Sequence, residues 1–141
     1  MSFSHQENQS FSRPYRLKSK DALNAVFTKG EKAQAWPIVL HYLDLGLPQP
    51  VPCQATVSVS KRRFKKAVDR NRIKRLIREA WRLEKTPLEK SLLEQGKQRA
   101  IVFIFVGNEI PTFDKIRSCV QDALKKMNRQ TNLPSHDEAV S

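Results

Sequence analysis

The segment from Ser58 to Arg82 restricts the fold more than any other, because it joins a strand end to an amphipathic helix. Apolar residues recur in its second half at the spacing of one helix face, namely Ile73, Leu76, Ile77, Ala80 and Trp81. This face must pack against another layer of structure. We expect Asp69 to cap the helix and the regular turns to begin at Arg70.

The opposite face of the same helix is strongly cationic. Eleven basic residues between Lys61 and Arg82 meet two acidic ones, an excess of +9 in a chain of net charge +12. A solvated helix face usually mixes positive and negative side chains, so a face of one sign indicates a polyanionic ligand. The planar guanidinium of arginine suits phosphate groups and guanine edges. The pattern predicts a nucleic-acid-binding surface formed by Lys61, Arg62, Arg63, Lys65, Lys66, Arg70, Asn71, Arg72, Lys74, Arg75, Arg78 and Arg82.

Three strands are expected around this helix. Residues 53–60 alternate between apolar and small polar side chains, which predicts a strand with a polar face. That face is either the floor of a nucleic-acid groove or simply the solvent side of a sheet. Residues 100–106 are continuously apolar, which predicts a strand buried on both faces and a possible parallel neighbour of the first. Residues 36–43 form the third expected strand.

The remaining signals mark helices and ends. Ser19 can cap a helix over residues 20–29 that stops at Gly30, and Thr112 can cap a last helix. Residues 1–12 and 130–141 are expected to be disordered tails around one domain, residues 13–129. The predicted fold is mixed α/β (α+β), in the order α-β-β-(β)-α-β-α with a split in the first strand region.

Catalytic patterns are missing from the sequence. It contains neither a glycine-rich phosphate loop nor a metal-ligand spacing, and Glu109 and Asp114 lack a third carboxylate for a two-metal site. Cys53 and Cys119 are expected to be buried, reduced thiols of a cytoplasmic protein, because no secretory or membrane-spanning pattern is evident. The residues alone therefore predict an RNA- or DNA-binding domain without its own active site.

The stretch from Ala67 to Ala80 closely resembles the Arg-Asn-Arg motif of the bacterial ribonuclease P protein subunit. Arg16-Leu-Lys, Val26-Phe27 and Gly30 are similar to that family's N-terminal helix region, and residues 57–61 to its central strand. The resemblance covers about residues 13–128.

The resemblance implies a small α-β sandwich like the second domain of ribosomal protein S5, with a left-handed crossover between two parallel strands. It implies a protein subunit that binds a large catalytic RNA and the 5′ leader of precursor tRNA. Together the two subunits form an endoribonuclease that removes the leader by metal-dependent hydrolysis, with Mg²⁺ bound mainly by the RNA. No membrane and no obligate protein partner are expected.

By the same resemblance, Arg70, Asn71, Arg72, Lys74, Arg75 and Arg78 lie against the catalytic RNA. A cleft beside the first helix would receive the leader, using Phe27, His41, Ser58, Ser60, Lys61 and Arg70. Leu23 stands where many members have an aromatic residue, and His41 where tyrosine is frequent. Residues 62–66 lack a glycine that many members carry. No metal ligand is assigned on the protein.

Three alternatives share parts of this pattern. A structural, ribosomal-type RNA-binding protein has the same charge but no role in cleavage. A self-sufficient nuclease would need Glu109 or Asp114 for metal-dependent cleavage without RNA. A basic helix that binds membrane surfaces or a partner would leave Ile73, Leu76 and Trp81 exposed.

Overall fold

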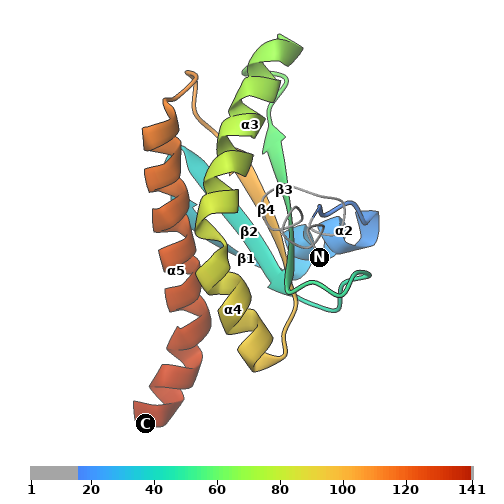
Figure 1. The fold of residues 1–141 in the computed structure, drawn as a ribbon, viewed down its shortest axis with the longest axis vertical. Coiled ribbons are helices and arrows are strands. Elements are labelled where there is room, and N and C mark those ends of the chain that lie inside the picture. The colour runs from blue at the N-terminus through green and yellow to red at the C-terminus, as the bar shows by residue number, and fades with distance from the viewer. Residues whose placement is uncertain (1–15, 141) are drawn as a thin grey trace, which may run out of the picture.

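The computed structural model describes residues 16–140, and the side chains of residues 16–131. The expected tail at residues 1–12 lies outside this range. The elements, in chain order, are α2 (Lys20–Lys29), β1 (Glu31–Ala35), β2 (Ile38–Asp44), β3 (Cys53–Val59), α3 (Ala67–Glu84), α4 (Thr86–Gln95), β4 (Arg99–Phe105) and α5 (Phe113–Val140). Figure 1 shows their arrangement and confirms the predicted mixed α/β fold.

The strands form one four-stranded sheet in the order β1-β2-β4-β3. β2 is antiparallel to β1 and β4, whereas β3 and β4 are parallel, with Val57 opposite Phe103. The predicted parallel pairing is thus confirmed. In Figure 1 both parallel strands point upward, α3 lies in front of them, and β4 lies to the left of β3, which makes the crossover left-handed. Parallel crossovers are nearly always right-handed, so this topology is distinctive.

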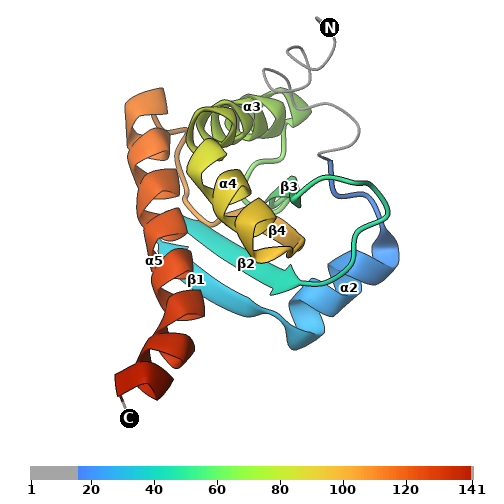
Figure 2. The same cartoon turned by 60° about the horizontal axis from the view of Figure 1, so that its bottom comes forward.

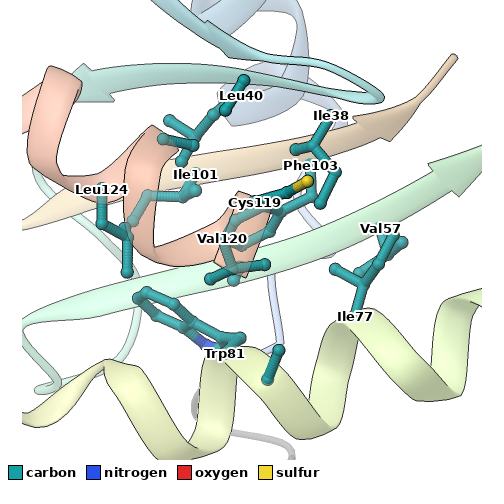
Figure 3. Packing of buried hydrophobic residues seen from close by; sticks show 14 of the residues in the cluster. Ile38, Leu40, Val57, Ile77, Trp81, Ile101, Phe103, Cys119, Val120 and Leu124 are labelled. Carbon is teal, nitrogen blue, oxygen red and sulfur yellow. The ribbon is translucent and has the colours of Figure 1, made fainter. Parts of the chain in front are cut away.

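The apolar face of α3 packs on the sheet as its periodicity predicts. Ile73, Ile77, Ala80 and Trp81 are buried, and the Trp81 ring lies 5.5 Å from that of Phe103. Figure 3 shows this layer, in which side chains of α3, α5 and the strands meet. Burial of these side chains rules out the exposed apolar stripe that a membrane-surface helix requires.

The opposite face of the sheet is covered in part by α2, as the view in Figure 2 shows. A smaller apolar cluster joins Val26 of α2 to Ala100 and Val102 of β4. β4 is therefore covered on both faces, which confirms the expectation from its continuous apolar run. α3 therefore lies over one face of the sheet and α2 over the other.

Two of the three predicted N-caps are present. Ser19 Oγ accepts a hydrogen bond from the amide of Ala22 at 3.2 Å, and Thr112 Oγ1 accepts one from Lys115 at 3.2 Å. Gly30 ends α2 where the chain passes close to β2. A Cβ at Gly30 would lie 2.3 Å from the Val26 carbonyl oxygen and 2.5 Å from that of Tyr42, so close backbone approach explains the glycine.

Three details differ from the sequence predictions. β1 is the additional strand that the predicted order allowed, but it precedes residue 36 as a separate edge strand paired with β2. Its sequence, rich in alanine and charged residues, carries little strand signal. The predicted Asp69 cap is wrong, because the amides of Asp69 and Arg70 both bond to the Lys66 carbonyl at 3.2 Å and α3 begins at Ala67. Asp69 instead lies in the first turn, where a carboxylate suits the helix dipole.

The third difference concerns the last helix. α5 continues to Val140, through residues for which the sequence predicted a disordered tail from position 130. The hydroxyl of Tyr42 donates to Gln130 Oε1 at 2.6 Å, so the sheet holds the helix at the residue where the tail was expected to begin. None of the helices in the described range is long and apolar enough to cross a membrane.

Candidate nucleic-acid interface

The structure gathers the predicted cationic residues on one loop and one helix. Packing of α3 on the sheet turns its basic side outward. The half-buried members of this set are Arg70, Lys74, Arg78 and Arg82. The exposed members are Lys61, Arg62, Arg63, Lys65, Lys66, Asn71, Arg72 and Arg75. We call residues 61–66 the basic loop. Contact of these side chains with RNA stays a prediction.

The basic loop has a defined shape because its own polar groups fold it. Ser60 Oγ accepts hydrogen bonds from the amides of Arg62 and Arg63 at 3.1 and 3.4 Å. Arg63 Nη1 donates to the Val106 carbonyl at 2.8 Å and to Asn108 Oδ1 at 2.9 Å. These bonds tie the loop after β3 to the loop after β4, so the basic loop is organised before any ligand binds.

Arg70 contributes to the same organisation. Its Nη1 donates to the carbonyl oxygens of Phe64 and Lys65 at 2.8 and 2.9 Å. Phe64 is buried, with its ring 5.9 Å from Phe105. The geometry therefore gives Arg70 a structural role that the sequence did not predict, in addition to the RNA contact expected of it.

The basic residues at the far end of α3 are engaged differently. Arg82 forms a two-point ion pair with Glu79, with nitrogen–oxygen distances of 3.1 and 2.5 Å. Burial and the neighbouring Arg16 guanidinium lower the pKa of Arg78. Arg16 thus adds positive charge beside α3. Its segment is bound to the edge of β3, where the Leu17 amide donates to the Ala55 carbonyl. Sequence reasoning left Arg16 out of the site, although its basic lead-in was visible.

The predicted leader cleft lies on the other face of the sheet. Phe27 of α2 is 50% exposed, and its ring centroid lies 5.1 Å from that of His41 on β2. Ser58 of β3 is exposed and lies on the same face of the sheet. It is paired with Ile104 of β4, which is paired with Val39 of β2, and Val39 shares a face with His41 because the two are two residues apart. Phe27 and His41 are in contact, and Ser58 shares their sheet face without touching them in the described structure.

The other three predicted cleft residues occupy its basic end. Ser60 and Lys61 follow β3 directly, and Arg70 holds the loop that they begin. Ser60 Oγ is occupied by two amides of that loop. The six residues thus lie on the α2 face of the sheet and at the start of the basic loop, and a leader cleft between them stays a prediction.

The charge of His41 depends on its surroundings. Partial burial lowers the pKa of His41, and the Lys32 ammonium on β1, opposite it in the strand register, lowers it further. The imidazole is therefore neutral near pH 7. This position differs from a tyrosine in that it can gain a positive charge in mildly acidic solution.

Carboxylates do not assemble into a metal centre in the described part of the chain, where no three His, Cys, Asp or Glu side chains lie close enough to hold a metal ion. Glu109 and Asp114 are exposed beside the loop between β4 and α5. The two thiols are free and buried, and burial raises the pKa of Cys53 to about 12.

One exposed aromatic residue was missed. Trp36 was expected to begin a strand, but it occupies the turn between β1 and β2 and is 65% exposed. The signal available in the sequence was Pro37 directly after Trp36, because a proline has no amide to donate within a sheet and is disfavoured in a strand interior.

Together, the left-handed βαβ unit, the basic loop and helix, and the polar sheet face define a small RNA-binding protein of the α/β class. The chain belongs to the ribonuclease P protein family, whose family model, described as ribonuclease P, matches residues 11–128. This membership implies an RNA-processing role.

Individual relatives agree with this assignment. The chain is 38% identical over 125 residues to the ribonuclease P protein component of Porphyromonas gingivalis, covering 88% of this chain and 89% of the relative. It is 32% identical over 122 residues to that of Chlorobaculum tepidum, covering 78% and 77%.

Solved structures support the fold. The RNase P protein of Staphylococcus aureus matches with a TM-score of 0.62 at 24% identity, over 79% of this chain and 93% of that one. The RNase P protein of Thermotoga maritima matches with a TM-score of 0.60 at 23% identity, over 78% and 94%.

Proposed function

We propose that this chain is the protein subunit of ribonuclease P and that it binds both the catalytic RNA and the 5′ leader of precursor tRNA. The observation that carries the proposal is the exposure of Asn71, Arg72 and Arg75 on the outer side of α3, in a chain of this family. The relatives in P. gingivalis and C. tepidum are named ribonuclease P protein component, which supports the same role here.

The basic loop and α3 bind the catalytic RNA through phosphate contacts. Each phosphate that is neutralised releases condensed counterions, so the affinity depends steeply on salt. The hydrogen bonds of Arg63 and Arg70 hold the loop in one shape, and a preformed surface loses less conformational entropy on binding. The protein thus reduces repulsion between RNA phosphates.

The cleft beside α2 binds the single-stranded leader. Phe27 offers an exposed ring for base stacking, and Ser58 and His41 offer polar contacts that do not select one sequence. Binding of the leader favours precursor over mature tRNA, which lacks it. The protein therefore increases cleavage by positioning the substrate.

Magnesium supplies the activated water and charge stabilisation that phosphodiester hydrolysis needs. We propose that the RNA subunit holds most of these ions.

Leader cleavage from precursor tRNA at low Mg²⁺, with the organism's catalytic RNA and with or without this protein, tests the proposal. We expect strong stimulation by the wild type and loss of it in Arg72→Ala/Arg75→Ala. Leu93→Ala is the control, because Leu93 is exposed on α4, outside the predicted RNA-binding residues. A folded protein that binds ribosomal RNA equally well and gives no stimulation would instead be a structural RNA-binding protein.

A further inference from the structure

Trp36 is an exposed ring on a fixed backbone. Its carbonyl oxygen accepts a hydrogen bond from Cys119 Sγ of α5 at 3.2 Å, and the next carbonyl, of Pro37, accepts one from the Val106 amide at 2.8 Å. The side chain itself is 65% exposed. The backbone that carries the ring is therefore ordered before a ligand binds, which lowers the entropic cost of binding.

The ring of Trp36 borders two hollows in the surface. The larger, of about 490 Å³, lies between the β1–β2 turn and the β4–α5 loop and is lined also by Asn108, Thr112 and Lys115. The smaller, of about 190 Å³, is lined also by Gln34 and Val106. Single exposed apolar residues are common and carry no function by themselves. Hollows beside an aromatic ring are different, because they leave room for a flat group to stack on it.

Cationic and polar groups surround this corner of the molecule. Lys115 lines the larger hollow beside the acidic Glu109, and Lys126 Nζ donates to the Gln34 carbonyl at 2.6 Å, next to the smaller one. Arg63 of the basic loop donates to Val106 and Asn108, each of which lines one hollow. The corner is therefore continuous with the basic loop and has three cations against one carboxylate among these groups.

We propose that Trp36 stacks on an unpaired nucleotide of the catalytic RNA and extends the RNA-binding surface from the basic loop to the β1–β2 turn. This inference rests on the proposed function. An aromatic base suits the exposed indole, and the phosphates on either side of it suit Arg63 and Lys115. The RNA subunit is the occupant because the larger hollow is bordered by α5 and the β4–α5 loop, whereas the leader cleft lies beside α2.

Tryptophan fluorescence tests the contact directly. The chain has two tryptophans, and Trp81 is 2% exposed, so the difference between wild type and Trp36→Phe isolates the signal of Trp36. We expect the catalytic RNA to quench this difference signal at saturation. The dissociation constant for the catalytic RNA should rise about tenfold in Trp36→Ala and recover in large part in Trp36→Phe. Leu93→Ala is the matched control, because Leu93 is 66% exposed on α4.

Different failures have different meanings. Wild-type affinity in Trp36→Ala with no quenching would overturn the stacking contact, and normal leader cleavage would leave the proposed function intact. Quenching that appears only when precursor tRNA joins the holoenzyme would overturn the assignment to the RNA subunit. Absence of any binding of the catalytic RNA by wild type would overturn both proposals. Circular dichroism of Trp36→Ala shows whether lost affinity comes from a lost fold.

Discussion

The rings of Phe27 and His41 contact each other across the predicted leader cleft, with centroids 5.1 Å apart and planes tilted by 59°. One residue comes from α2 and the other from β2, so this contact joins α2 to the sheet where the leader is predicted to bind. Burial and the cross-strand Lys32 lower the pKa of His41, which keeps the imidazole neutral near pH 7.

This arrangement predicts opposite effects of acid on binding and on stability. Because the pKa of His41 is lowered, its imidazole gains a proton only at a pH below the ordinary histidine range, and the charged ring can then contact a leader phosphate. We expect acidification to raise the affinity of the wild type for precursor tRNA about two- to fivefold more than that of His41→Tyr. Ca²⁺ replaces Mg²⁺ in this measurement to suppress cleavage. The lowered pKa means that the unfolded chain takes up this proton more readily, so His41 should reduce folding stability over the same pH range. An affinity with the same pH dependence in both proteins would contradict the prediction.

Arg75 and Arg82 lie on the same helix but should affect RNA binding differently. Arg75 is exposed, whereas Arg82 is paired with Glu79. In a plot of log affinity for the catalytic RNA against log salt concentration, Arg75→Ala should reduce the slope by about one. Arg82→Ala should leave the slope close to that of wild type. Equal losses in both variants would show that the whole outer side of α3 contacts RNA.

Replacement of Arg70 should weaken the fold as well as the site. Arg70→Ala removes two hydrogen bonds to the carbonyls of Phe64 and Lys65 and should lower the free energy of unfolding by about 1–2 kcal/mol. Arg72→Ala, at an exposed position two residues further along α3, should change the free energy of unfolding by less than about 0.5 kcal/mol. Urea denaturation of the free protein measures both. Unchanged stability of Arg70→Ala would mean that the basic loop does not depend on this side chain.

Gly30 and Gly46 provide a matched pair for the position of α2. A Cβ at Gly30 would meet the Val26 and Tyr42 carbonyls, whereas one at Gly46 has nothing within 4 Å. Gly30→Ala should therefore destabilise the protein by about 1–3 kcal/mol and reduce affinity for precursor tRNA, because α2 carries Phe27. Gly46→Ala should have little effect on either. Thermal unfolding and leader binding test the pair, and equal behaviour of the two variants would argue against tight packing at Gly30.

The sequence predicted the elements whose signals are local. The apolar period of α3, the continuous apolar run of β4 and the caps at Ser19 and Thr112 all depend on residues within a few positions of one another, and the structure confirms them. The cationic surface was visible for the same reason, since a helix that buries one side must expose the other. The family resemblance added the left-handed crossover, which periodicity could not indicate.

Long-range packing decided what each charged or aromatic side chain does. Arg63 and Arg70 look alike in the sequence, yet one joins the basic loop to Val106, 43 positions away, and the other closes the loop on itself. β1 becomes a strand because β2 pairs with it, and Trp36 becomes an exposed ring because Cys119 of α5 and Val106 hold its turn. Such contacts join residues distant in the chain, and their energies depend on the assembled fold, so local pattern alone could not predict them.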